Sequence, residues 1–223
     1  MTTIKRLIKS IPLVGPILYW ILQASYRQAT SWFHQVESFY SWRKLQKSGN
    51  IKLELGAGAK SGRNGWTTVD LNGVADISHD LRRGIPLKDG TVSEIYTSHM
   101  FEHIPYSQLI KFIAECRRAL KPGGFLSVCV PNSRLYIQAY IDKKAPNELN
   151  SFYRPAIVET NSFLDQVNYI AYMDGQHAYL FDEENLVNTL RKAGFSNVKL
   201  REYDPSLDIF ARDFESIYAI AKK

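Results

Sequence analysis

The residues best placed to do chemistry begin with a glycine-rich turn after an apolar run. Residues 53–58 read LELGAG, and a second short apolar run ends in an acid at Asp70. Glycine has no Cβ, so backbone amides at such a turn can approach a ligand closely. An acid at the end of the next strand can accept hydrogen bonds from both hydroxyls of a ribose. Together these features predict a pocket for a cofactor that contains adenosine.

The stretch between the turn and the acid narrows the choice of cofactor. Asp70 comes only 14 positions after Gly56, and Ser61 stands where a dinucleotide fingerprint needs its third glycine. Asn64 and Gly65 interrupt any helix that begins there, so a pyrophosphate would have no helix N-terminus to bind. A cofactor without phosphates, such as S-adenosylmethionine, fits better. For the two glycines taken alone, an ordinary tight turn remains an alternative.

Three histidines are candidates for a general base, which is worth about 10²–10⁴ in rate for an oxygen nucleophile. His99 directly follows a predicted strand, His103 lies four residues on, and His177 falls in a later irregular segment. For His103 we favour a structural hydrogen bond to loop backbone; His99 and His177 stay open between catalysis and structure. The His99–His103 spacing also fits a metal-binding helix, but Pro105 disfavours helix just before it, so we expect no metal.

These groups need a scaffold, and from residue 51 strands and helices alternate along the chain. The pattern predicts an α/β fold: a Rossmann-like, doubly wound, mostly parallel seven-stranded sheet with an N-terminal helical extension. The expected strands are Ile51–Leu55, Trp66–Leu71, Ala75–Ser78, Glu94–Ser98, Gly124–Val130, Asn197–Tyr203 and Phe214–Ala221. One helix should run from Pro105 to the Lys-Pro-Gly-Gly at 121–124, and Asp182 should cap a second.

Residues 132–181 are less regular and should lie over the carboxyl ends of the strands, where ligands bind in open α/β sheets. We interpret them as a substrate-side insertion, with residues 143–147 as a loop. Tyrosines are dense in the insertion, and we favour packing over stacking on a sugar ring. They are Tyr136, Tyr140, Tyr153, Tyr169, Tyr172 and Tyr179.

Composition sets limits on the class of protein. Apolar residues make up 45% and charged residues 22% of the 223 residues, which is ordinary for a globular domain. Both cysteines, Cys116 and Cys129, lie in apolar context and indicate buried thiols in a reducing compartment. Residues 1–50 carry seven basic residues and one acid, which accounts for the whole net charge of +6. The remainder is neutral overall, so we expect no nucleic-acid partner.

Residues 1–48 form the extension, which we expect to be amphipathic helix. Ile11–Leu22 is wholly apolar, but 12 helical residues reach only about 18 Å, so the segment does not span a bilayer. Basic residues beside Trp- and Tyr-rich helix favour peripheral contact with an anionic membrane at the inner face of a cytoplasmic protein. Packing on the body or on a second subunit is the alternative, and a signal peptide is a third. No feature indicates an oligomeric state.

The motifs together resemble those of class I S-adenosylmethionine-dependent methyltransferases. They are 54–58 (ELGAG), 69–70 (VD), 80–81 (DL), 98–103 (SHMFEH) and 118–124 (RALKPGG). The nearest resemblance is to a compact branch often associated with bacterial cell-surface glycan biosynthesis. It covers about residues 51–222, so we assign 49–223 to a methyltransferase domain.

The resemblance implies S-adenosyl-L-methionine as the cofactor and a set of residues that bind it. Glu54 would anchor the amino group through water, the turn backbone would face the methionine part, Asp70 would hold the ribose, and Asp80 with Leu81 the adenine edge. The full cofactor-binding set is Glu54, Gly56, Ala57, Gly58, Asp70, Leu71, Asp80, Leu81 and His99. For Asp80 a role as a turn or cap residue is the alternative.

By the same resemblance we expect O-methylation of a sugar hydroxyl in a surface glycan or its lipid-linked precursor. Another small-molecule or quinone-like acceptor remains open. A scaffold that keeps the fold without catalysis, and recruits partners or membranes through its N-terminal helix, is a further alternative. A nucleotide-dependent oxidoreductase is disfavoured by the missing third glycine.

Overall fold

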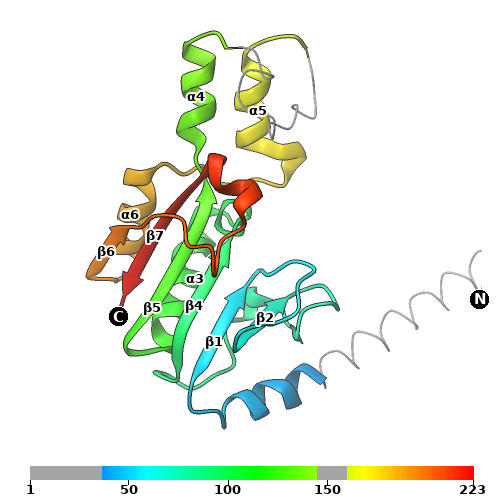
Figure 1. Ribbon diagram of the computed structural model, residues 1–223, viewed down its shortest axis with the longest axis vertical. Coiled ribbons are helices and arrows are strands. Elements are labelled where there is room, and N and C mark those ends of the chain that lie inside the picture. Colours follow the sequence, from blue (N-terminus) through cyan, green and yellow to red (C-terminus); the bar gives the residue numbers. More distant parts are fainter. Residues whose placement is uncertain (1–36, 145–159) are drawn as a thin grey trace, which may run out of the picture.

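The structure, a computed structural model, describes residues 37–144 and 160–223 (Figure 1). Within these residues seven strands form one sheet in the order β3-β2-β1-β4-β5-β7-β6. Among them, β7 runs antiparallel to β5 and β6, and the other pairs are parallel. The predicted α/β class with a mostly parallel seven-stranded sheet is confirmed.

The strands lie close to their predicted positions. They are β1 (Ile51–Leu55), β2 (Trp66–Asp70), β3 (Ile77–Ser78), β4 (Val92–Ser98), β5 (Leu120–Pro131), β6 (Asn197–Leu200) and β7 (Ser216–Lys222). The largest difference is at β5, which starts at Leu120 rather than Gly124. Leu120 pairs with Val92 and Phe125 pairs with Glu94, so the Lys-Pro-Gly-Gly segment is accommodated as an irregularity in the ladder. The last strand also begins later than predicted, after a 3-10 turn.

Besides the helical residues 37–45, four α-helices and four 3-10 helices accompany the sheet in the described residues. They are α3 (Tyr106–Ala119), α4 (Ser133–Ile141), α5 (Leu164–Tyr172), α6 (Glu183–Lys192), η1 (Leu81–Arg83), η2 (Phe101–His103), η4 (Met173–Gly175) and η5 (Phe210–Glu215). Asp182 caps α6 as predicted, because its carboxylate accepts a hydrogen bond from the Asn185 amide at 2.7 Å. Pro105 stands at the N-cap of α3, one position before the predicted first turn.

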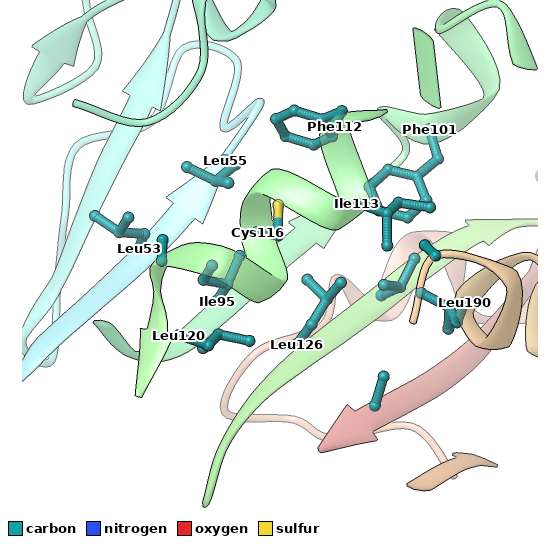
Figure 2. Close-up of a cluster of buried hydrophobic side chains, with 14 of the residues drawn as sticks. Leu53, Leu55, Ile95, Phe101, Phe112, Ile113, Cys116, Leu120, Leu126 and Leu190 are labelled. Carbon is teal, nitrogen blue, oxygen red and sulfur yellow. The ribbon is translucent and has the colours of Figure 1, made fainter. Parts of the chain in front are cut away.

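The main core lies between the sheet and the helices α3 and α6. Figure 2 shows Leu53, Leu55 and Ile95 of the sheet against Ile113 and Cys116 of α3. All five side chains are fully buried. The apolar positions of α3 recur at helical spacing, so burying them on the sheet fixes the helix orientation. The carboxyl ends of β1 and β4 are thereby held rigidly, and the candidate site is built on them.

The opposite face of the sheet carries a second, aromatic cluster. Tyr96, Cys129 and Tyr218 are buried there, and Tyr203 and Leu207 from the segment after β6 pack against them. Both cysteines are free and buried, as predicted. The segment that follows β6 therefore takes part in covering this face.

Above the carboxyl ends of the strands, α4 and α5 project from the body as a helical pair (Figure 1). They belong to the predicted insertion at 132–181. Most of the loop expected at 143–147, and Tyr153, lie outside the described residues. Tyr136 is buried and Tyr172 is 63% exposed, so the tyrosines of the insertion do not share one role.

The described part of the N-terminal extension packs on the body. Residues 37–45 are helical, and Trp42 from this helix is buried in the main core, with its ring 5.5 Å from that of His79. Residues 1–36, which hold the apolar run at 11–22, lie outside the described residues. None of the helices in the described ranges has both the length and the apolar character required to cross a membrane.

Candidate active site

The glycine-rich turn at the end of β1 has the conformation that the sequence demands. Gly56 has φ of +69°, and a Cβ added there would lie 2.6 Å from Cγ of Met100. Gly58 has φ of +62°, and no atom lies within 4 Å of the place where its Cβ would be. Gly56 is therefore required by both conformation and packing, whereas Gly58 leaves the backbone open to a ligand.

Asp70, at the end of β2, is tied directly to that turn. One carboxylate oxygen accepts a hydrogen bond from the Gly58 amide at 2.9 Å, and the other accepts from the Asn72 amide at 3.0 Å. The sequence predicted the turn and the acid as separate contributors to one pocket. In the structure the carboxylate also shapes the turn, so the two halves of the pocket hold each other in place.

A cavity of about 680 Å³ opens beside these groups. Five of the predicted cofactor-binding residues line it: Gly56, Asp70, Leu71, Asp80 and Leu81. Glu54, Ala57, Gly58 and His99 are not among its lining residues. Their contact with the cofactor stays a prediction.

The cavity also has walls that the sequence did not single out. Met100 and Ile104 line it from the segment after β4, and Gln108, Lys111 and Glu115 line it from α3. For the three residues of α3, the sequence signal that could have found them is the helical spacing, which places 108, 111 and 115 on one face. That face becomes a pocket wall only when α3 docks beside η1.

Asp80 is held by a neighbouring arginine. Its carboxylate receives two hydrogen bonds from the Arg82 guanidinium, at 2.8 and 2.9 Å, and also caps η1 through the Arg82 amide. These hydrogen bonds hold the pKa of Asp80 below its usual value. Asp80 therefore has the cap role that the sequence left open as an alternative. Because the Arg82 side chain is 73% exposed, it can move aside for a ligand at modest cost.

The carboxylate of Glu54 forms an ion pair with a primary ammonium group. The Lys60 amine lies 2.7 Å from Oε1 of Glu54, and the carboxylate is only 16% exposed. A methionine amino group has the same chemistry as this amine, so the donor set suits the cofactor. Residues 56–65, all of them described, contain no helix, which agrees with a cofactor that lacks phosphates. The residues present therefore fit S-adenosylmethionine.

His99 faces away from the cavity toward β7. Its Nε2 lies 3.0 Å from Oγ of Ser216, and that hydroxyl donates its own hydrogen to the Arg212 carbonyl at 2.6 Å. Ser216 can thus only accept from His99, so we assign the proton to Nε2 and the lone pair to Nδ1. Burial, with Arg212 nearby, lowers the pKa of His99 to about 3. His99 is therefore neutral at pH 7 and a weak base.

Glu102 lies buried beside His99. Its side chain is 3% exposed, and Oε1 lies 3.6 Å from His99 Nδ1 and 3.8 Å from His103 Nε2. Both distances are too long for hydrogen bonds. Oε2 makes no hydrogen bond with any described residue. Burial raises the pKa of Glu102 to about 8.

His103 and His177 meet across the site, with ring centroids 5.0 Å apart. His103 Nδ1 donates to the Gln176 carbonyl at 2.9 Å, and His177 Nδ1 donates to the Ile170 carbonyl at 2.6 Å. His103 thus makes a bond to loop backbone of the kind that the sequence favoured, and its partner is Gln176, the residue that follows η4. Burial lowers the pKa of His177, which favours its neutral form.

We call His99, Glu102, His103 and His177 the acceptor-side cluster. The structure brings all three predicted histidines into it. Next to it, the Tyr136 hydroxyl donates to Glu215 Oε2 at 2.6 Å, which links α4 to η5. The cluster lies at the carboxyl ends of β4 and β5, under the helical pair α4 and α5.

Comparison with known proteins identifies the family of this chain. Residues 28–200 match the family of methyltransferase domains. The chain belongs to this family. The match begins inside the segment that the sequence analysis treated as an extension, and it includes the glycine-rich turn, the acceptor-side cluster and α6.

One relative and two solved structures illustrate the likeness. A probable S-adenosylmethionine-dependent methyltransferase of Mycolicibacterium smegmatis is 27% identical over 153 residues, which is 59% of this chain and 59% of that protein. The match thus spans less than two thirds of the relative. A SAM-dependent methyltransferase from Archaeoglobus fulgidus has TM-score 0.48 and 15% identity, over 92% of this chain and 99% of its own.

A phosphoethanolamine N-methyltransferase 2 from Haemonchus contortus, in complex with phosphomonomethylethanolamine and S-adenosylhomocysteine, has TM-score 0.43 and 14% identity. The match covers 79% of this chain and 50% of that protein. At these TM-scores neither structure says anything about the acceptor of this chain. Family membership confirms the predicted enzyme class, a methyltransferase with S-adenosylmethionine as its cofactor.

Proposed function

We propose that this methyltransferase transfers a methyl group from S-adenosylmethionine to a sugar hydroxyl of a cell-surface glycan or its lipid-linked precursor. The observation that carries the proposal is the double role of residues 99–104. Met100 and Ile104 line the cofactor cavity, while Glu102 and His103 belong to the acceptor-side cluster. One short segment therefore faces the cofactor on one side and a polar acceptor site on the other.

The cofactor, when bound, supplies an activated methyl group on a sulfonium. Asp70 and Asp80 would hold its nucleoside part, since both carboxylates line the cavity. Glu54 would bind its ammonium group in place of Lys60. What remains for the protein is to orient the acceptor, and such orientation can lower a barrier by roughly 7–11 kcal/mol.

The acceptor-side cluster supports a hydroxyl acceptor. In the neutral imidazoles of His103 and His177, Nδ1 carries the proton, so each Nε2 presents a lone pair. A lone pair of this kind can accept a hydrogen bond from a hydroxyl and then take its proton as the methyl group arrives. His99, with its strongly lowered pKa, is better suited to position its neighbours than to hold a proton.

The test is incubation of the purified protein with isotope-labelled S-adenosylmethionine and separate pools of lipid-linked glycan intermediates and quinone precursors. Mass analysis then identifies which molecules gained a methyl group, and NMR locates the methylated atom. We expect an O-methyl sugar. Methyl transfer confined to the quinone pool would overturn the acceptor assignment, and cofactor binding without transfer to either pool would favour the scaffold.

A variant separates the acceptor site from the cofactor site. His177 does not line the cavity, so His177→Ala should bind S-adenosylmethionine with unchanged affinity and lose at least about 10²-fold in kcat. Glu202→Gln, at an exposed position outside both the cluster and the cavity lining, serves as the control that keeps methyl transfer.

We also propose, for residues 1–36, peripheral contact with the anionic inner face of a membrane. The support is the excess of basic residues among aromatic and apolar ones. Because Trp42 is buried in the core, the truncation should end before residue 37. In a flotation assay with anionic vesicles, the full chain should float with the vesicles and the truncated protein should not. Equal flotation of both would contradict the proposal.

A further inference from the structure

The acceptor-side cluster brings together the buried carboxyl group of Glu102 and the imidazoles of His103 and His177, which are only partly buried or exposed. One ligand-type atom from each of Glu102, His103 and His177 lies within 4.8 Å of the other two. Neither imidazole can donate into the site in its neutral form, because each uses its Nδ1–H on a backbone carbonyl. His99 adds a further lone pair, at Nδ1, 3.6 Å from Glu102.

Oxygen and nitrogen lone pairs that converge in this way can be shared by a single cation. Glu102 is 3% exposed, and its Oε2 has no hydrogen-bond partner within the described ranges. A buried polar atom without a partner is uncommon in folded proteins and calls for an unseen water, ion or ligand. The backbone carbonyls that hold both Nδ1 atoms are the outer-shell partners that usually orient metal-binding histidines.

We propose that Glu102, His103 and His177 bind a divalent first-row transition metal ion, with Zn²⁺ as the test ion. Two imidazoles and one carboxylate form a donor set suited to such ions, and an all-oxygen site for Mg²⁺ or Ca²⁺ would have a different composition. Ligands about 2.1 Å from a shared tetrahedral zinc lie roughly 3.4 Å apart. The distance between Glu102 Oε1 and His103 Nε2 is 3.8 Å, and the three ligand atoms lie within 4.8 Å of one another, so the side chains must draw together to bind an ion.

Three protein ligands leave a coordination position open, and the His103 side chain is 39% exposed, so the position is accessible. Its use in catalysis rests on the proposed function. An acceptor hydroxyl that coordinates the ion becomes more acidic; its O–H bond breaks, the electron pair stays on oxygen, and the proton leaves to water. The histidines then serve as ligands, and hydroxyl activation passes from the imidazole lone pairs to the ion.

The sequence predicts no metal, because His99 and His103 would have to share a helix that Pro105 disfavours. In the structure η2 ends at His103 and Ile104 is extended, so no such helix forms. The second imidazole comes instead from His177, at the far end of the insertion, and no spacing rule connects residues so distant in the chain.

The experiment is isothermal titration of the chelator-treated, full-length protein with ZnCl₂, together with visible absorption after loading with Co²⁺. We expect one ion per chain with micromolar or tighter affinity, and the d–d bands of a tetrahedral Co²⁺ site. Glu102→Gln and His177→Ala should each weaken binding at least about tenfold and alter the bands. His79→Gln, a histidine outside the cluster, is the matched control and should bind as the wild type does.

Absence of binding in the wild type, or equal binding in the wild type and Glu102→Gln, would overturn the site. Glu102→Gln keeps the shape of the side chain, so it remains decisive if His177→Ala does not fold. The two proposals can be refuted separately. Metal binding without methyl transfer would refute the proposed function alone. Methyl transfer to a sugar without metal binding would refute the metal site alone.

Discussion

Two regions of this molecule each bury a carboxylate, and they treat it in opposite ways. On the aromatic face of the sheet, Asp208 accepts two hydrogen bonds from Arg201, at 2.6 and 2.8 Å, and one from the Tyr96 hydroxyl at 2.9 Å. At the carboxyl ends of the strands, Glu102 has two histidines at 3.6 and 3.8 Å and an oxygen that bonds to no described residue.

The difference separates a structural group from a functional one. A buried charge is tolerated when it is paired and hydrogen-bonded, as Asp208 is. A buried acid left incomplete destabilises the chain, so its presence is best explained by a partner that arrives from outside. Burial alone is the same in both regions; what distinguishes them is whether the chain itself supplies the partners.

The largest expected effect is on stability at Asp208. Asp208→Ala should lower the free energy of unfolding by about 3–5 kcal/mol, because it leaves the buried Arg201 charge without its anion. Denaturant unfolding at pH 7 measures this. Asp204→Ala, in the same segment but only partly buried and bonded to Ser206, is the control and should cost about 1 kcal/mol or less. A loss at Asp208 no larger than that of the control would remove the contrast.

A smaller effect is expected at Asp70, whose carboxylate serves both the turn and the cavity. Asp70→Ala should weaken S-adenosylmethionine binding at least tenfold, about 1.4 kcal/mol, because charge-assisted hydrogen bonds to the ribose are lost. Calorimetric titration measures the affinity. Asn72→Ala removes only the side-chain amide that also donates to Asp70 at 3.0 Å, and it keeps the carboxylate, so it should bind nearly as the wild type does. Unchanged affinity in Asp70→Ala would refute the ribose assignment.

Glu102→Gln should change the free energy of unfolding of the metal-free protein by less than about 1 kcal/mol, since Oε2 has no hydrogen bond to lose. The same acid-to-amide change at Asp208, in Asp208→Asn, should cost at least about 2 kcal/mol. Thermal unfolding in the presence of chelator compares the two. Equal losses would show that Glu102 is as fully satisfied within the chain as Asp208.

The smallest effect concerns Glu115, an acid that the chain satisfies at the cavity wall. Hydrogen bonds from Arg118 hold its pKa below the usual value. A lowered folded-state pKa gives stability that is present above the unfolded value, about 4.5, and lost as pH falls through the folded value. As the pH is lowered from 5 to 3, the free energy of unfolding should therefore fall more steeply for the wild type than for Glu115→Gln. Glu202→Gln, at an exposed site, should follow the wild type.

The cofactor side of the molecule was largely readable from the sequence. Gly56, Asp70 and Leu81 were predicted to share a pocket, and all three line the cavity. They come from one short stretch, where glycine conformation, strand ends and capping are local properties. The walls from α3 were not foreseen, because Lys111 and Glu115 reach the cavity only through the docking of a helix whose apolar face alone was evident.

The acceptor side was only partly readable. The three histidines were singled out by type, and His99 also by its position after a strand, but the sequence paired His99 with His103. The structure instead places His177 against His103, through two backbone carbonyls of the insertion. Nothing in the local sequence reveals that the side chain of Glu102 is buried, or that its Oε2 bonds to no described residue.

By itself the sequence determined the sheet, the glycine-rich turn and the acid that closes the cofactor pocket, because periodicity and backbone conformation act over a few residues. Tertiary structure alone decided which imidazoles meet, which carboxylate stays incomplete and which helix lines the cavity. Those outcomes depend on contacts between distant segments, and their energies arise from burial and desolvation that exist only once the chain is folded.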